Sequence, residues 1–276
     1  MPRDSRLEQL IWRFVTRADR ILGIRAARSL TALVIRVGAR SPQGWAKGVL
    51  RVAARHVWSN APALHKVPER WWRNYPVVRV QRLGLDIELD LRDNLQRILY
   101  YTGTYEPQVL ALLRRHLRRG DVFVDVGANV GVHALTVARH FQRLGGGRVF
   151  AFEPAADAAA RLRATARANH LDVAVVEVAL GREQGKVSLF GDDRYDPADF
   201  GVRSQYGSGR PVATVSVVPF DAWAADIKLD RLDAVKIDVE GGEGHVIEGM
   251  RESLRRLRPR LLVVELKHSH YKEAGA

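Results

Sequence analysis

Asp125, Gly127, Asn129 and Gly131 occupy alternate positions of residues 125–131, where an apolar run changes into a helical pattern. Glycine permits positive φ and leaves the backbone open to a ligand, and asparagine tolerates the same left-handed region. A helix that begins directly after such a turn also presents unsatisfied N–H groups to whatever lies in the crevice. These residue types in this order predict a ligand-binding turn between a buried strand and a helix.

Three ligand chemistries compete for this turn. A phosphate-binding P-loop would end in Gly-Lys-Ser or Gly-Lys-Thr, whereas this turn continues as Gly131, Val132 and His133. A dinucleotide loop would read G-x-G-x-x-G, and Asn129 and Val132 replace two of its three glycines. The remaining pattern, D-x-G-x-N-x-G, suits a ligand with an amino-acid end and a nucleoside end but no pyrophosphate, and S-adenosylmethionine is such a ligand. A turn that binds nothing is the alternative, because glycine turns often follow strands.

Two further strand patterns end in acidic residues. Residues 148–152 have the pattern of a short buried strand that ends at Glu153, and residues 233–237 that of another strand, which is followed by Asp238 and Glu240. In doubly wound sheets, an acid after the second strand accepts hydrogen bonds from ribose hydroxyls, and ligands bind at the carboxyl edge. We therefore expect Glu153 to bind the nucleoside end of the ligand. The alternative for Glu153 is a solvated charge at a strand end.

Asp238 and Glu240 are the candidate catalytic residues. A carboxylate at this edge could remove a proton, hold a metal ion or face a cationic sulfonium centre. We favour proton removal without a metal over Mg²⁺ coordination, in which the ion would acidify a hydroxyl. A histidine metal site is not expected, because no metal-ligand spacing relates His133, His245, His268 and His270.

Five segments carry a resemblance to a known family. They are GTYEP (103–107), DVFVDVGANVG (121–131), FEP (152–154), VALG (178–181) and VKIDVEGGEGHVIEG (235–249). Through them, residues from about 77 to 266 resemble the FkbM-like family of S-adenosylmethionine-dependent methyltransferases, with Gly242 where alanine is common. The resemblance implies an α/β fold, namely a Rossmann-like class I methyltransferase sheet with helices on both faces. It also implies O-methylation, since the family's acceptors include sugars and polyketide-type natural products.

Cofactor contacts are expected from eight residues: Glu106, Asp125, Gly127, Asn129, Gly131, Glu153, Ala179 and Asp238. Glu106 begins a helix expected over 107–118 and is expected to reach the methionine end of S-adenosylmethionine. The alternative for Glu106 is an acid that simply favours a helix N-terminus. Ala179 belongs to a turn expected at 179–181, beside the adenine.

The remaining sequence predicts the elements around this sheet. Alternating apolar and acidic residues in 85–91 predict a half-buried strand that forms a hairpin with residues 78–80. The polar segment 191–211 carries spaced aromatic residues, which suits either an acceptor-pocket lid or a disordered surface loop. Helices are also expected over 155–169 and 243–257, and strands over 173–178, 187–190, 212–218 and 261–266.

Composition limits the class of protein. The chain has 276 residues, enough for one α/β domain with an extension. It contains no cysteine, so neither a disulfide framework nor a thiolate metal site is expected. No run of 18 apolar residues appears and the N-terminus lacks a secretory pattern, so a cytoplasmic protein is expected.

Residues 1–75 carry most of the positive charge. They hold 13 Arg and 2 Lys against 2 Asp and 2 Glu, a net charge of +11 out of +13, and five of the six tryptophans. An apolar helical face flanked by arginines in residues 7–22 suits a helix at an anionic membrane, here the inner face. Nucleic acid is a less favoured partner. The alternative without any binding partner is a helical cap that packs on the domain 76–276. The rival functional hypothesis is a catalytically silent cofactor-binding protein that this leader anchors to a membrane or to nucleic acid.

The end of the chain predicts an incomplete sheet. The fold that the chain resembles normally has seven strands, whereas only ten residues follow the strand expected at 261–266. Ten residues cannot supply two strands and a helix, since a strand averages about five to six residues. We therefore expect strands six and seven to be absent. The open sheet edge would then make the chain marginally stable or prone to dimerise.

Overall fold

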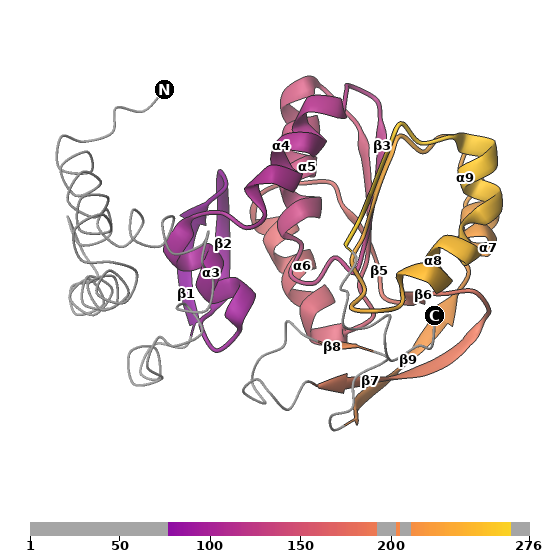
Figure 1. Ribbon diagram of the computed structural model, residues 1–276. Coiled ribbons are helices and arrows are strands. Elements are labelled where there is room, and N and C mark those ends of the chain that lie inside the picture. The colour runs from indigo at the N-terminus through magenta and orange to yellow at the C-terminus, as the bar shows by residue number, and fades with distance from the viewer. Residues whose placement is uncertain (1–76, 192–202, 205–210, 266–276) are drawn as a thin grey trace, which may run out of the picture. The chain divides into compact units, whose positions relative to one another are not determined.

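The computed structural model describes residues 77–191, 203–204 and 211–265 (Figure 1). The expectations for residues 1–75, for most of the 191–211 loop and for the last ten residues lie outside the described residues. The chain divides into two compact units: of the described residues, 77–82 and 89–105 fall in one, and 83–88 and 106–265 in the other. Among the helices of the described residues, none has the length and apolar character needed to cross a membrane.

The larger unit is built on a parallel sheet of five strands. The strands are β3 (Val122–Val126), β4 (Arg148–Phe152), β5 (Ala174–Val176), β10 (Ala234–Ile237) and β11 (Leu261–Val264), in the order β11-β10-β3-β4-β5. The chain runs outward from β3 through β4 to β5 and then returns to the other side of β3 with β10 and β11. The strand order therefore reverses between β3 and β10, and a ligand crevice is expected at the carboxyl end of such a pair.

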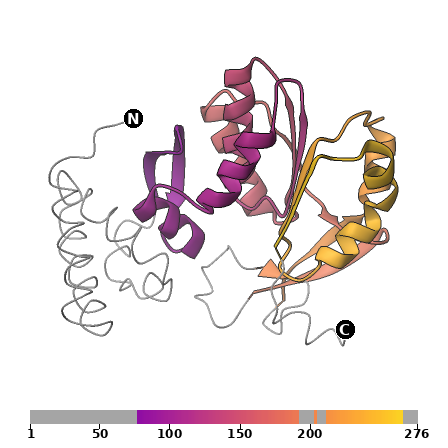
Figure 2. The same cartoon turned by 45° about the horizontal axis from the view of Figure 1, so that its top comes forward.

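Helices cover both faces of this sheet, as Figures 1 and 2 show. One face packs against α4 (Pro107–His116), α5 (Val132–Leu144) and α6 (Ala156–Ala168). The other packs against α7 (Phe220–Asp226), α8 (Glu243–Gly249) and α9 (Arg251–Leu257). The predicted α/β fold class, with a Rossmann-like sheet covered on both faces, is confirmed.

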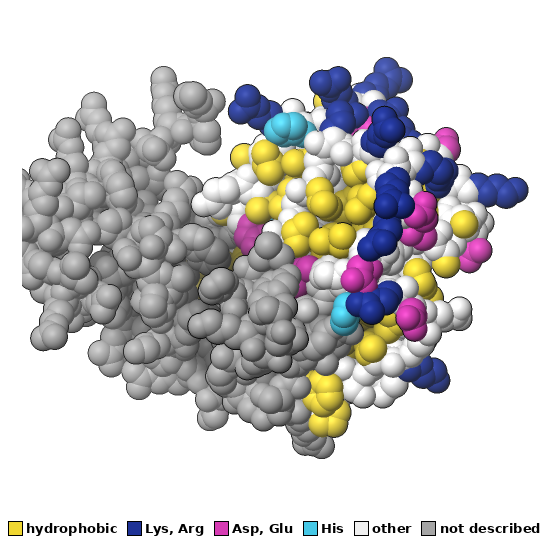
Figure 3. Space-filling model, turned by 45° about the vertical axis from the view of Figure 1, so that its right-hand side comes forward, with side chains coloured by type: hydrophobic (Ala, Val, Ile, Leu, Met, Phe, Trp, Pro, Cys, Tyr) yellow, Lys and Arg dark blue, Asp and Glu magenta, His cyan; other side chains and the backbone are white. Residues whose placement is uncertain are grey.

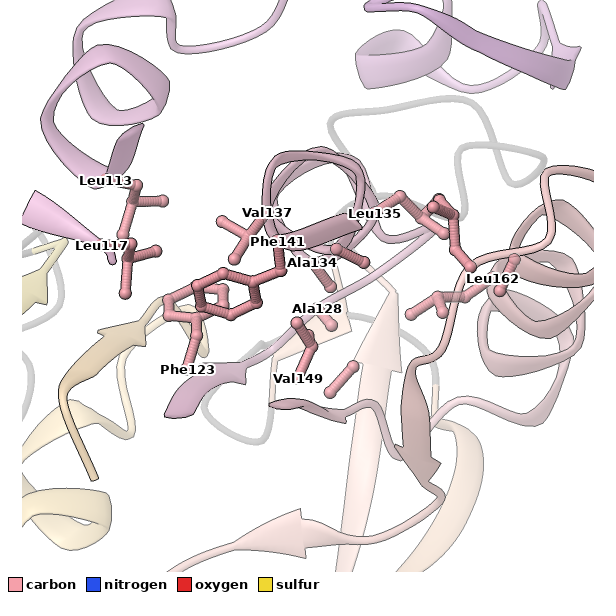
Figure 4. Close-up of a cluster of buried hydrophobic side chains, with 14 of the residues drawn as sticks. Leu113, Leu117, Phe123, Ala128, Ala134, Leu135, Val137, Phe141, Val149 and Leu162 are labelled. Carbon is pink, nitrogen blue, oxygen red and sulfur yellow. The ribbon is translucent and has the colours of Figure 1, made fainter. Parts of the chain in front are cut away.

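Strand β3 supplies both cores, because successive side chains of a strand point to opposite faces. Val122, Val124 and Val126 belong to the cluster beneath α7 and α8. Phe123 faces α5 and packs in the opposite cluster, which Figure 4 shows with Phe141. All five residues of β3 are buried, and burying one large apolar side chain stabilises a fold by about 1.5–3 kcal/mol.

The same alternation places Asp125 on the α5 face, in line with Phe123. On the neighbouring strand β10, Ala234 packs in that same cluster, and Lys236 lies two residues further along. Lys236 is the register partner of Asp125. The sheet therefore brings a lysine and an aspartate side by side at the carboxyl end of its two central strands.

A second sheet follows β5 in the chain. It contains β6 (Ala179–Leu180), β7 (Gly185–Gly191), β8 (Arg203–Ser204) and β9 (Pro211–Val218), in the order β6-β9-β7-β8. The strands predicted at 187–190 and 212–218 are confirmed as parts of β7 and β9. The prediction of a turn at 179–181 is wrong for the first two of its residues, which form β6. Ala179 pairs with Val217 in a short parallel ladder, because Leu180 is buried and the buried backbone needs hydrogen-bond partners.

The predicted hairpin is present as β1 (Val77–Arg82) and β2 (Leu85–Asp90). Its two turn residues, Leu83 and Gly84, have φ values of 55° and 77°, the positive values that a tight hairpin requires. A helix that the sequence analysis did not predict follows, α3 (Asn94–Thr102). Its N-cap is Asp93, whose carboxylate accepts the Gln96 N–H at 2.8 Å.

The single helix predicted over 243–257 is wrong, because two helices occupy this range. They meet at Met250, which has a φ of −106° and a ψ of 0°. Close packing precedes the break: a Cβ on Gly249 would lie 1.9 Å from the carbonyl oxygen of Gly181. The end of α8 therefore packs directly on backbone of the second sheet, and the chain changes direction to continue as α9.

Candidate active site

The turn between β3 and α5 has the predicted left-handed conformation. Gly127, Asn129 and Gly131 have φ values of 78°, 51° and 86°. A Cβ on Gly127 would lie 1.8 Å from the carbonyl oxygen of Asp238, and one on Gly131 would lie 2.5 Å from Cγ of Leu162. Both glycines are therefore required by close contacts within the chain, whatever ligand the turn receives.

The N–H groups of this turn already have acceptors. Gly127 and Ala128 both donate to the carbonyl oxygen of Phe152 at 2.9 Å, and Gly131 donates to that of Ala128 at 2.8 Å. These three N–H groups are therefore not free to bind a ligand. A pyrophosphate cradle needs such free donors, so the hydrogen bonding of the turn disfavours phosphate ligands.

Glu153 ties the first two βα turns together. Its Oε2 accepts the Asn129 N–H at 2.7 Å, and its Oε1 accepts the Ala155 N–H at 2.9 Å. The residue is only 8% exposed, so Glu153 is not the solvated charge that was its alternative interpretation. A carboxylate fixed by two backbone donors at the end of the second strand is well placed to accept hydrogen bonds from a nucleoside's hydroxyls.

We expect Glu153→Ala to weaken S-adenosylmethionine binding by about 10- to 100-fold, because hydrogen bonds to charged groups contribute about 1.5–3 kcal/mol. Glu153→Gln keeps an acceptor oxygen and should lose less. Isothermal titration calorimetry would measure both, with Glu183→Ala, at an exposed acid in the β6–β7 loop, as the control. Unchanged affinity in Glu153→Ala, or NADH binding by the unmodified protein, would contradict the assignment.

Asp125 caps α5 from the neighbouring strand. Its Oδ2 accepts the Ala134 N–H at 3.0 Å in the first turn of a helix whose own N-cap, Gly131, has no side chain. Its Oδ1 is buried and has no hydrogen-bond partner among the described residues. Burial raises the pKa of Asp125 above its ordinary value, although the nearby Lys236 ammonium acts in the opposite direction. A buried acceptor without a donor at a sheet's carboxyl edge fits a ligand that brings one.

Lys236 was not predicted as a site residue, yet it lies at the centre of the charged groups. Its ammonium is 3.0 Å from Oδ2 of Asp238, and the residue is 4% exposed. Burial lowers the pKa of Lys236, but the carboxylates of Asp238 and Asp125 outweigh it, so the pKa lies above its ordinary value. A lysine within an otherwise apolar strand, two residues before an acid on the same face, is the signal that could have identified it.

Glu106 contacts α5 instead of capping its own helix. It has a φ of 42°, makes no side-chain cap of α4, and places Oε2 3.2 Å from Nε2 of His133. It also interacts electrostatically with Lys236. Glu106, Asp125 and Asp238 therefore surround one lysine, and the structure brings these three predicted residues together.

Glu243, also absent from the predicted site, braces the turn that carries Glu240. Its Oε1 accepts the N–H groups of Val239 at 3.2 Å and of Gly241 at 3.0 Å, and the residue is buried. Glu240 lies between these donors with a φ of 58°. The sequence signal that could have identified Glu243 is the pattern of residues 240–243, in which two acids flank two glycines. Two glycines indicate a tight turn, and the N–H groups of such a turn need an acceptor.

Ala179 differs from the other predicted residues, because it lies in the ladder of β6 and β9, in the second sheet. Throughout the described ranges, no group of three or more His, Asp or Glu side chains is arranged to hold a metal ion. The site therefore consists of a glycine turn, the buried carboxylate of Glu153, and the carboxylates of Glu106, Asp125 and Asp238 near the buried Lys236.

Comparison with known proteins points to one family. A family profile described as the methyltransferase FkbM domain matches residues 125–276. The chain is 28% identical over 162 residues to the hexuronic acid methyltransferase AglP of Haloferax volcanii, covering 58% of this chain and 62% of that protein. It is 29% identical over 165 residues to the 2-O-methyltransferase NoeI of Sinorhizobium fredii, covering 55% and 65%. The chain thus spans slightly less than two thirds of each relative.

A solved structure is also similar. It is the SAM-dependent methyltransferase from Agrobacterium tumefaciens, at 10% sequence identity and a TM-score of 0.39, with 74% of this chain and 64% of that chain covered.

Proposed function

The chain belongs to the FkbM methyltransferase family, and from this premise we propose that it transfers a methyl group from S-adenosylmethionine to a hydroxyl oxygen. The acceptor class that we propose is a sugar or a polyketide-type natural product. The names of two relatives, a hexuronic acid methyltransferase and a 2-O-methyltransferase, support a sugar acceptor. The observation that carries the proposal is the carboxylate cluster around Lys236, which lies beside a glycine turn whose Gly127, Ala128 and Gly131 N–H groups already have acceptors.

The residues present fit the proposed cofactor. Asp125 offers a buried acceptor oxygen without a donor, which suits the ammonium group of the methionine end. Glu106 lies in the same cluster and would bind that end too. Glu153 would accept the ribose hydroxyls. When bound, S-adenosylmethionine supplies a methyl group on a positively charged sulfur, which an oxygen nucleophile displaces in line.

The remaining contacts are assigned to the turn and to the second sheet. Gly127, Asn129 and Gly131 would line the cofactor with their backbone, since their positive φ values keep the turn compact. Ala179 would contact the adenine, as the sequence predicts.

The chain's own contribution to the reaction is positioning and proton removal. Holding an acceptor hydroxyl about 3 Å from the methyl group supplies much of the rate enhancement. The hydroxyl must also lose its proton, and a carboxylate within hydrogen-bond reach can take it. We assign this role to Asp238, because the Lys236 ammonium fixes its carboxylate at 3.0 Å, and keep Glu240 as the alternative. Mg²⁺ at these carboxylates is the less favoured chemistry.

Three further statements remain proposals. A cytoplasmic enzyme that contacts an anionic membrane through residues 1–75 accounts for the charge of that segment, with nucleic acid as a less favoured partner. The competing hypothesis is a catalytically silent protein, which would bind the cofactor as the enzyme does but would not transfer the methyl group. Dimerisation through the edge of β11 is the third proposal, since β11 ends the sheet of the described residues.

The decisive experiment incubates the protein with S-adenosylmethionine carrying a labelled methyl group. The acceptor panel would contain hexuronic acids, neutral sugars, glycans and polyketide alcohols. We expect label to appear on a sugar hydroxyl, in a bond that resists the mild base that cleaves esters. Binding of the cofactor without labelling of any acceptor would favour the silent binding protein, and labelling of a carboxylate or nitrogen would contradict O-methylation.

A further inference from the structure

The edge of the sheet opposite the candidate site carries a different charge. Because the five strands of the sheet are parallel, the segments that lead into them meet at one amino edge, uppermost in Figure 1. We call this surface the amino-edge face and define it as residues 114–121, 143–148, 167–173, 226–233 and 251–260. All of these segments belong to the larger unit.

The amino-edge face is strongly basic. Its five segments contain fourteen Arg and Lys against six Asp and Glu, a net charge of +8. Figure 3, in which the same edge is uppermost, shows Lys and Arg side chains gathered along it. Residues 76–276 together carry a net charge of only +2, so this concentration reflects how the fold distributes charge and not an overall excess.

The carboxyl edge has the opposite sign. The segments that leave the five strands, residues 127–131, 153–155, 177–178, 238–243 and 265, contain six Asp and Glu and no Arg or Lys. The larger unit is therefore a charge dipole along its strands. A dipole of this kind adopts one orientation on a charged surface, since the electrostatic energy differs between its two ends.

Two of the basic residues of the face bind buried carboxylates within the fold. Arg231 and Arg260 each bind the buried carboxylates of Asp121 and Asp233 at 2.5–2.7 Å, which ties the starts of β3, β10 and β11 together. Other arginines of the face are exposed, among them Arg119 and Arg143. These side chains are available to a partner without loss of the internal network.

Exposed aliphatic side chains lie among these cations. Leu144 follows Arg143 at the end of α5 and is 37% exposed, and Ile227 precedes Lys228 after α7 and is 43% exposed. An apolar side chain that projects from a basic surface can insert between lipid headgroups while the cations bind the anionic ones. Single-stranded nucleic acid is instead bound through aromatic stacking, and the five segments contain no Phe, Trp or Tyr.

We propose that the amino-edge face docks the enzyme on an anionic lipid surface, with Leu144 and Ile227 inserted and the acidic carboxyl edge directed away from the membrane. A strand of five residues is about 16 Å long. The candidate active site, at the other end of the strands, would therefore lie at least that far above the headgroups. The acceptor would therefore be reached from the aqueous side. This proposal concerns the methyltransferase domain itself, is independent of residues 1–75, and does not rest on the chemistry proposed above.

Site-specific labelling tests the proposal on the full chain. The natural sequence has no cysteine, so a single introduced cysteine can carry a polarity-sensitive fluorophore. Leu144→Cys and Ile227→Cys report on the amino-edge face. Val212→Cys, at a 51% exposed apolar residue of β9, is the matched control. With vesicles that contain phosphatidylglycerol, we expect blue-shifted emission from the first two labels and none from the third, and no shift with phosphatidylcholine alone.

A charge-matched pair of variants completes the test. Arg119→Gln with Arg143→Gln should weaken partition onto the anionic vesicles by about 30-fold, since each cation near the surface contributes about 1 kcal/mol. Arg182→Gln with Lys186→Gln removes the same charge around the second sheet and should change partition less than threefold. Vesicle binding without any label shift would mean that another segment binds, and would overturn the proposal. So would shifts produced by an oligonucleotide and not by vesicles, which would identify nucleic acid as the partner.

Discussion

Gly127→Ala is expected to destabilise the protein by about 2–5 kcal/mol and to abolish measurable S-adenosylmethionine binding. Two costs combine. An alanine with a φ of 78° is strained by about 1–2 kcal/mol, and its Cβ would lie 1.8 Å from the Asp238 carbonyl oxygen. Relief of that contact requires movement of the β3–α5 turn away from the end of β10. Because Asp125 and Asp238 lie on these two elements, the movement would also separate the carboxylates that are proposed to hold the cofactor.

Gly120→Ala is a matched control, because it isolates the conformational strain. Gly120 has a φ of 79°, almost the same as Gly127, but no atom lies within 4 Å of a Cβ built on it. It should therefore lower the melting temperature by only about 2–8 °C and leave cofactor affinity unchanged. Differential scanning calorimetry and titration calorimetry would compare the two variants. If they lost equal stability and both bound the cofactor normally, the contact with Asp238 would have no part in forming the site.

The central sheet could be predicted from sequence because each of its strands carries a local signal. Residues 122–126 are apolar on both faces, and the following Gly127 and Gly131 mark where the strand ends and the helix begins. The hairpin was predictable for the same reason, since acidic residues alternate with Leu85, Ile87 and Leu89 and since Gly84 supplies a turn. In these segments the tertiary structure reinforces local preference.

The errors come from contacts between distant segments. The predicted long helix is divided at Met250, next to Gly249, which packs on the backbone of Gly181, almost seventy residues earlier in the chain. Ala179 was placed in a turn, whereas its ladder partner Val217 comes from the far side of the 191–211 segment. Helical periodicity and strand length contain no information about either contact.

The candidate site was predicted residue by residue but not as a network. Glu153 followed from its place after the second strand, and its two backbone donors agree with a fixed role. Lys236 and Glu243 were missed because neither is an acid at a strand tip that suggests a ligand or a base. Their roles, which are to neutralise and to brace those acids, become visible from the tertiary contacts. A buried carboxylate needs a counter-charge or donors, and that requirement would have led to both residues.

Asp238→Asn is expected to lower kcat by about 10²- to 10⁴-fold, the range that a positioned general base contributes. Asparagine has nearly the same shape, so the backbone contact with Gly127 is kept. The amide cannot accept the hydroxyl proton, and it replaces the carboxylate that lies 3.0 Å from the Lys236 ammonium. Cofactor affinity should fall much less than kcat, because Asp125, Glu106 and Glu153 remain. Single-turnover kinetics with labelled S-adenosylmethionine would separate the two effects.

Glu240→Gln decides between the two candidate bases. Glu243 braces the turn that carries Glu240 by accepting the Gly241 N–H at 3.0 Å, and the Lys236 ammonium lies 3.0 Å from the carboxylate of Asp238. Because we assign the base to Asp238, we expect Glu240→Gln to retain kcat within about tenfold and to act mainly on KM for the acceptor, since a residue that does not take the proton affects binding more than the chemical step. If Glu240→Gln lost the larger factor and Asp238→Asn kept most of its kcat, the base would be Glu240. The Lys236 ion pair would then serve only to neutralise Asp125 and Asp238 within the fold.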